Sequence, residues 1–168
     1  ILSLPMCEAD DVVDDTVCSL RPFPPVADAF TTDDAFDIVV AGAWKKPAAI
    51  HVKEGRASLL GLSRSARRRA TRRRVVLSLG DNLAEVLAIE KGRARDRDLN
   101  AICRRAAALQ IGGDIAWRRR YIETKRNVSD KSSRIAEHGL LRPGETVGPL
   151  RAAQMLAAIS AGDVRGFK

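Results

Sequence analysis

The sequence predicts a mixed α/β domain with a sheet that is covered by helices. From Asp37 onward, short β-prone runs alternate with longer runs of helix formers, in the order β, β, α, β, α, α, β, α. This alternation favours a mixed sheet packed by helices. The chain has 168 residues, of which 45% are apolar, so it can bury a core of ordinary size. No internal repeat is visible, which points to one principal domain.

The first elements are expected between residues 38 and 69. Ile38 to Trp44 is a β-prone run, and Ala48 to Val52 is predicted to be a second short strand. Glu54 to Arg69 contains helix formers with a partial apolar face, so a helix is predicted directly after that second strand.

The next elements follow a clear order of strand and helix signals. Val75 to Leu79 is apolar enough to be a central strand that is covered on both faces. It ends at Gly80-Asp81-Asn82, a turn that also suits a helix start. Later elements are predicted at Leu83–Glu90 (helix), Leu99–Ile111 (helix), Ile115–Tyr121 (strand), Lys131–Glu137 (helix) and from Gly148-Pro149 to about Ser160 (helix).

The charge is divided unevenly along the chain. Residues 1–37 carry nine acids and one base, Arg21, for a net charge of −8, whereas residues 38–168 carry 28 bases and 12 acids, for a net charge of +16. Prolines and acid clusters predict a linker at 1–37. We therefore divide the chain into this acidic linker, a domain at 38–135, and a linker with a C-terminal helix at 136–168.

The basic part of the chain predicts a polyanionic partner, of which nucleic acid is the commonest. Arginine predominates over lysine, and its guanidinium group suits bidentate contacts with phosphate. A solvated cationic surface is the alternative interpretation. The arginines expected to bind the nucleic-acid backbone, without reading its sequence, are Arg67, Arg68, Arg69, Arg72, Arg73, Arg104, Arg105, Arg118 and Arg120.

Composition also bears on the compartment. Cys7, Cys18 and Cys103 lack the spacing of a zinc site or of a disulfide framework, which predicts a reducing compartment, the cytoplasm or the nucleus. No run approaches the ~20 apolar residues that a membrane span needs. The chain begins at Ile1 rather than at methionine, so we expect it to be a piece of a longer protein.

Three acidic residues stand where a fold of this order can bring carboxylates together. Glu54 is expected early in the first helix, Asp81 at the carboxyl end of the apolar strand, and Asp130 after the last strand. Ligand sites of open α/β sheets lie at such strand ends, and carboxylates that converge there can bind Mg²⁺. Each acid also has a purely structural interpretation, as a residue near a helix N-terminus, a turn residue or a cap.

Several segments around these acids resemble one known family. They are IHVKEGRA at 50–57, LSLGDN at 77–82, LAIEKGR at 87–93, YIET at 121–124 and NVSDKSSR at 127–134. Between about Ala43 and Arg134 the chain resembles the ribonuclease H domain of retroelement reverse transcriptases. The resemblance implies a ribonuclease H-like mixed sheet flanked by helices. It also implies that Glu54, Asp81 and Asp130 are catalytic ligands of Mg²⁺.

The resemblance is incomplete at one ligand. The family's first ligand is an aspartate on the opening strand, in a Thr-Asp-Ala/Gly-Ser context. Thr32-Asp33-Asp34-Ala35 and Val26-Ala27-Asp28-Ala29 are only faintly similar to it and lie close to Glu54, so we expect the first strand and its aspartate to lie upstream of this chain. No histidine precedes Asp130 where some members have one. The isolated chain is therefore expected to have little or no activity, as a remnant would.

The resemblance implies hydrolysis of the RNA strand of an RNA–DNA hybrid by two Mg²⁺ ions. The natural setting would be a larger polymerase, to whose other domains this chain would be fused. A non-catalytic, basic nucleic-acid-binding module of the same fold is the alternative. A third interpretation is a plain α/β domain whose acids are caps and whose charge serves solubility.

Overall fold

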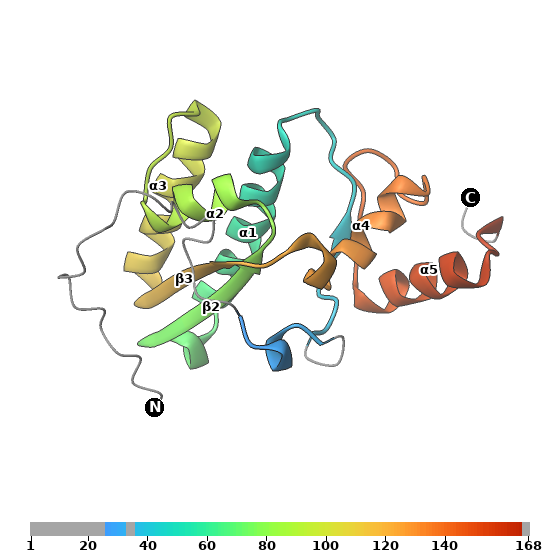
Figure 1. The fold of residues 1–168 in the computed structure, drawn as a ribbon, viewed down its shortest axis with the longest axis horizontal. Coiled ribbons are helices and arrows are strands. Elements are labelled where there is room, and N and C mark those ends of the chain that lie inside the picture. Colours follow the sequence, from blue (N-terminus) through green and yellow to red (C-terminus); the bar gives the residue numbers. More distant parts are fainter. Residues whose placement is uncertain (1–25, 33–35, 166–168) are drawn as a thin grey trace, which may run out of the picture.

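A computed structural model describes residues 26–32 and 36–165 of the chain. Most of the acidic segment therefore lies outside the described residues, as do Asp33 and Asp34, which were considered as the first ligand. Figure 1 shows two groups of elements side by side. One contains helices α1, α2 and α3 with strands β2 and β3, and the other contains α4 and α5 with β1 and β4.

The described elements are five helices, four strands and short 3₁₀ turns. The helices are α1 (Ile50–Ala66), α2 (Leu83–Glu90), α3 (Arg97–Gly113), α4 (Asp130–Glu137) and α5 (Pro149–Ala161). The strands are β1 (Ala41–Gly42), β2 (Arg74–Gly80), β3 (Ile115–Tyr121) and β4 (Thr146–Val147), and the 3₁₀ turns η1, η3 and η4 span Asp28–Phe30, Arg69–Thr71 and Thr124–Arg126.

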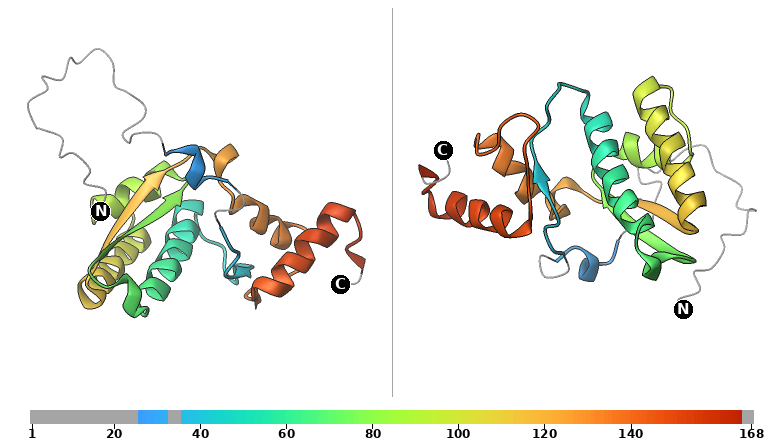
Figure 2. Two further views of the ribbon diagram at one scale, coloured as in Figure 1. Left: turned by 90° about the horizontal axis from the view of Figure 1, so that it is seen from below. Right: turned by 180° about the vertical axis from the view of Figure 1, so that it is seen from behind.

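Strands β2 and β3 form a parallel pair that is covered on one face. Val76 lies opposite Trp117 and Ser78 lies opposite Arg119 on the face that packs against the helices. Helices α1, α2 and α3 all lie on that side, as the two views of Figure 2 show. The other face is open, with Val75 70% exposed and Leu77 46% exposed. The expectation that this strand is covered on both faces is therefore wrong for the described part of the chain.

The main core lies between the three helices and the inner face of the sheet. It is built from Val52, Leu59, Leu62, Ala88, Ile89, Leu99, Ile102, Cys103, Ala106 and Trp117. Helices α1 and α3 approach closely because Gly55 has no side chain. A Cβ atom at Gly55 would lie 3.2 Å from the Cδ1 atoms of both Leu99 and Ile102, which is tighter than ordinary van der Waals contact.

Two side chains fix where helices begin. Asn82 Oδ1 accepts a hydrogen bond from the Glu85 N–H at 3.2 Å and caps α2. Asp96 Oδ1 accepts from the Leu99 N–H at 2.7 Å and caps α3. Such caps satisfy backbone donors that have no partner within the helix. The cap at Asn82 places the turn that contains Asp81 between the end of β2 and the start of α2.

A second, smaller core joins residues that are far apart in the sequence. Strands β1 and β4 pair antiparallel, and helices α4 and α5 pack against them and each other. The core consists of Ala41, Ile135, Leu140, Leu141, Val147, Ala152 and Met155. The predicted division at residue 136 thus falls inside a packed unit, which the C-terminal helix completes.

The α/β class is confirmed, and most elements match the sequence prediction closely. The helix Leu83–Glu90 and the strand Ile115–Tyr121 have the predicted bounds. The strand predicted at Ala48–Val52 is wrong, because α1 begins at Ile50. Of the strand predicted at Ile38–Trp44, only Ala41–Gly42 is observed. The strands form two separate pairs rather than one continuous sheet.

The described N-terminal residues are attached to the end of the parallel sheet. The Arg126 Nη2 atom, just beyond β3, donates to the Val26 carbonyl at 2.8 Å and to Thr31 Oγ1 at 3.2 Å. It also pairs with Asp28 Oδ1 at 2.5 Å. Asp28 therefore serves here as an ion-pair partner. Among the described helices, none is both long and apolar enough to cross a membrane.

Candidate functional site

Glu54 and Asp81 come together at the carboxyl end of strand β2. Glu54 lies in the second turn of α1, and Asp81 directly follows β2. Both side chains are partly buried. They interact closely enough for the negative charge of Asp81 to act on the Glu54 carboxyl group. The sequence predicted this pair, although Glu54 is four residues further into the helix than expected.

The environment of Glu54 opposes its ionisation. Burial raises the pKa of Glu54 from 4.5 to about 7, and repulsion by Asp81 and Glu85 adds to this effect. A hydrogen bond from the Asn82 side chain and the positive charge of Arg119 lower the pKa, but they do not outweigh the other causes. Its ionised form is therefore disfavoured below about pH 7, and a cation that approaches would favour the anion.

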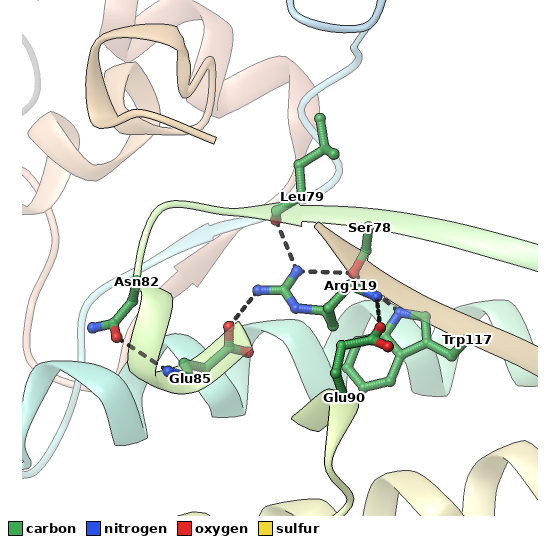
Figure 3. A network of polar contacts seen from close by, with 7 residues as sticks. All are labelled: Ser78, Leu79, Asn82, Glu85, Glu90, Trp117 and Arg119. Carbon is green, nitrogen blue, oxygen red and sulfur yellow. Dashed lines mark hydrogen bonds and ion pairs between the residues drawn. The ribbon is translucent and has the colours of Figure 1, made fainter. Parts of the chain in front are cut away.

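A buried ion pair between Glu85 and Arg119, drawn in Figure 3, acts on Glu54 through the charges of both side chains. Arg119 Nη2 donates to Glu85 Oε2 at 2.6 Å, with the two side chains only 3% and 0% exposed. Arg119 is the middle arginine of three on β3, and it points to the helix side of the sheet. It is thus a structural cation inside the domain, and the sequence prediction did not identify it or Glu85.

Further contacts fix the guanidinium group of Arg119. Its Nη1 atom donates to Ser78 Oγ and to the Leu79 carbonyl, each at 2.8 Å. The indole N–H of Trp117 donates to the same Ser78 Oγ at 3.0 Å, and the guanidinium carbon lies 5.8 Å from the centre of the Trp117 ring. The Arg119 backbone N–H donates to Glu90 Oε1. These contacts hold Arg119 in one orientation, from which its positive charge acts on Glu54.

The network leaves two buried atoms without a hydrogen-bond partner in the structure. They are Glu85 Oε1 and Arg119 Nε. Such groups are costly in a protein interior. The stability of this network therefore depends strongly on the ion pair between Glu85 and Arg119, because that pair offsets the cost of the two unpartnered atoms.

Asp130 is held within its own helix. It is the first residue of α4, and its Oδ2 atom lies 3.8 Å from Arg134 Nη2. The Ser133 hydroxyl donates to the Asp130 carbonyl at 2.7 Å. Among residues 26–32 and 36–165, no three histidine, cysteine or acidic side chains are grouped so that they could hold a metal ion. The structure thus brings together Glu54 and Asp81, and the Mg²⁺ ion stays a prediction.

Two carboxylates can supply only part of a magnesium site. Mg²⁺ takes six oxygen ligands and usually retains several waters, so a site with one or two carboxylates is chemically reasonable. The raised pKa of Glu54 fits this donor set, because a bound cation would remove the repulsion between Glu54 and Asp81. Asn82 adds a polar side chain at the same place.

Most of the predicted phosphate-binding arginines lie at the surface. The connection between α1 and β2 exposes Arg67, Arg68, Arg69, Arg72 and Arg73. Helix α3 exposes Arg104 and Arg105. Strand β3 exposes Arg118, whereas Arg120 on the same strand is partly buried. The first group precedes β2, whereas Asp81 follows it. Since a seven-residue strand spans about 20 Å, these arginines and the carboxylate pair lie at opposite ends of the sheet.

The aromatic side chains and His51 have no position that requires nucleic-acid contact. Trp117 is 4% exposed and belongs to the core. Tyr121 and His51 are partly buried. The alternation of β3 was the available signal for Arg119, because a residue two positions after a buried tryptophan faces the same side.

Comparisons of this chain with models of protein families, with curated proteins and with solved structures give no match.

Proposed function

We propose that this chain is a ribonuclease H-like domain of a retroelement reverse transcriptase, which binds RNA–DNA hybrids and uses Mg²⁺ at Glu54 and Asp81. The order of its elements supports the proposal, because α1 precedes the parallel pair β2–β3 and helices α2 and α3 connect the two strands. The motifs that carry the resemblance lie on α1, at the end of β2, on α2 and after β3.

The observation that carries the proposal is the meeting of Glu54 and Asp81 beside a strand end. Two partly buried carboxylates that repel each other are unfavourable unless a proton or a cation lies between them. When bound there, Mg²⁺ would supply charge stabilisation for a displacement at phosphorus. The chain's own contribution is to hold Glu54, through the Asn82 hydrogen bond and the positive charge of the fixed Arg119 guanidinium.

The distance between the exposed arginines and the two carboxylates sets the minimum length of a duplex that can contact both. The exposed arginines at the start of β2 and the carboxylates at its end are about 20 Å apart. At ~3.4 Å per nucleotide along a strand, a bound duplex must extend over about six base pairs to reach both. The arginines contact the backbone only, so they carry no sequence preference.

Cleavage of a labelled RNA–DNA hybrid by the full chain tests this proposal. We expect hybrid binding and a slow, Mg²⁺-dependent cut in the RNA strand. The rate should fall at least about a hundredfold in Asp81→Asn, which corresponds to ~2.7 kcal/mol of lost transition-state stabilisation. Asp163→Asn, an exposed position near the C-terminus, is the control and should cut normally. Cutting that survives in Asp81→Asn would refute the assigned site.

A second candidate is a non-catalytic module that binds nucleic acid with the same surface. The position of Asp130 favours it, because this carboxylate pairs with Arg134 on its own helix and leaves two acids at the site. The same experiment separates the two functions. Hybrid binding that weakens steeply with salt, without any cut at high Mg²⁺ concentration, would establish the module.

A further inference from the structure

The outer face of the parallel sheet is largely open among the described residues, above all at Val75 and Leu77. We define this face by Val75, Leu77 and Leu79 of β2 and, in register with them, Ala116, Arg118 and Arg120 of β3. All three helices of the main group lie on the opposite side (Figure 2). Val75 and Leu77 are 70% and 46% exposed, although apolar strand residues of this kind normally face a packed layer.

Parallel strands are almost always covered on both faces. An exposed apolar surface on such strands therefore indicates a site for another segment. The area is narrow, because the two strands have seven residues each. It fits one helix or one extended segment better than it fits a whole domain.

The charges around the outer face restrict the chemistry of that segment. Arg118 lies on the face itself, opposite Leu77, and is exposed. Arg72, Arg73 and Arg74 are exposed at the start of β2. A segment that covers this face must offer apolar side chains to Val75 and Leu77, and acidic side chains to the arginines beside them.

The first 25 residues of this chain have this chemistry. They contain five acids, namely Glu8, Asp10, Asp11, Asp14 and Asp15, against the single base Arg21, for a net charge of −4. Apolar residues lie among and just after the acids, at Val12, Val13 and Val17. The charge of this segment is thus opposite to that of the face.

The chain also enters next to the sheet. Val26 and Asp28 are held by Arg126, five residues after the end of β3. The outer face extends for about 20 Å from there, and 25 residues can reach far beyond that distance.

We propose that residues 1–25 dock on the outer face of the β2–β3 sheet and cover Val75 and Leu77 in the same molecule. The docked segment neutralises arginines that would otherwise be available to a polyanion. It thereby acts as an internal competitor of nucleic acid. The docking does not depend on the proposed function, and it is tested without nucleic acid or metal.

Paramagnetic relaxation from Cys18 tests the docking in the full chain. A nitroxide is attached to Cys18 in a Cys7→Ser background, while Cys103, which is buried, stays unlabelled. We expect the methyl signals of Val75 and Leu77 to broaden. Those of Leu150 and Ile159 on α5, which belongs to the smaller group of elements away from the sheet, should stay sharp.

A charge variant and its matched control complete the test. Asp14→Asn with Asp15→Asn should lower the ratio of docked to undocked chains by up to about tenfold, because two surface ion pairs are lost. Glu137→Gln with Asp163→Asn removes two exposed acids elsewhere and should leave the broadening unchanged. Equal broadening of the methyl signals of all four residues, or none at Val75 and Leu77, would overturn the proposal. So would broadening that arises only between labelled and unlabelled copies, which would show that a second copy occupies the face.

Discussion

Among single residues, Glu54 gives the clearest pH dependence. Its pKa is about 7 in the folded chain, against an ordinary value of 4.5. Between these values the folded state holds a proton that the unfolded state has lost. The contribution of Glu54 to the free energy of unfolding is therefore present below about pH 4.5 and is lost as the pH rises through 7. Glu54→Gln should remove this loss. The free energy of unfolding of the variant, relative to that of the original chain, should therefore be higher at pH 8 than at pH 5.

Urea unfolding at several pH values measures this effect. The quantity of interest is the difference in the free energy of unfolding between the original chain and Glu54→Gln. Glu137→Gln, at an exposed position, is the control and should run parallel to the original chain at all pH values. A Glu54→Gln chain that also runs parallel would contradict the assigned pKa.

The Arg119–Glu85 pair predicts opposite outcomes for single and double substitutions. Arg119→Met leaves the fully buried Glu85 without its partner, which should cost about 3–5 kcal/mol of stability. Arg119→Met with Glu85→Leu removes both charges and should recover much of that loss, because an apolar pair needs no desolvation. Thermal and urea unfolding of the four chains of the double-mutant cycle give the coupling energy. Additive losses would contradict a direct interaction.

The run of three consecutive arginines on β3 explains why the Arg119–Glu85 ion pair was not predicted from the sequence. Arg118, Arg119 and Arg120 are identical as residue types, and a basic run on a strand is typical of a solvated surface. Only the alternation around the buried Trp117 separates the inward arginine from its neighbours. The partner Glu85 lies 34 residues away, so no local pattern connects the two.

At the scale of elements, the connection between α1 and β2 should control nucleic-acid binding. Replacing Arg67, Arg68 and Arg69 with alanine should weaken binding to all sequences about equally. It should also reduce the slope of log K against log salt by up to about three, since each phosphate contact contributes ~0.9. Fluorescence anisotropy with several duplexes at several salt concentrations measures both quantities.

The matched control for this triple variant removes the same charge elsewhere. Arg142, Arg151 and Arg165 are exposed in the smaller group of elements, and their replacement with alanine should change the slope less. Equal losses in the two triple variants would mean that binding follows net charge alone. A loss that depends strongly on sequence would contradict contact with the backbone.

The elements also show where local patterns fail. The predicted strand at Ala48–Val52 consists of residues that suit either element, and short apolar runs do not distinguish strand from helix. Packing decides the outcome, because Val52 and Leu59 bury on one face of α1 against α3. In contrast, the helix Leu83–Glu90 was predicted within its bounds, because Asn82 and Gly92 mark its two ends locally.

For the whole molecule, the two cores explain which long-range features were predictable. The main core follows from consecutive elements between Ile50 and Tyr121, whose order the sequence already indicates. The smaller core joins Ala41 to Val147 across more than a hundred residues. Its strands have two residues each, and their pairing therefore leaves no periodic pattern in the sequence. The position of Asp130 could not be predicted for the same reason, because its helix, α4, belongs to this smaller core.

The binding of Mn²⁺, as a paramagnetic substitute for Mg²⁺, tests whether Glu54 and Asp81 form a cation site. The electron paramagnetic resonance signal of free Mn²⁺ is followed at pH 8 as the chain is added, with the original sequence and with Glu54→Gln combined with Asp81→Asn. We expect the original chain to remove Mn²⁺ from the free pool and the double variant to leave it there. Equal binding by both chains, or no binding by the original chain, would contradict a cation site at these two carboxylates.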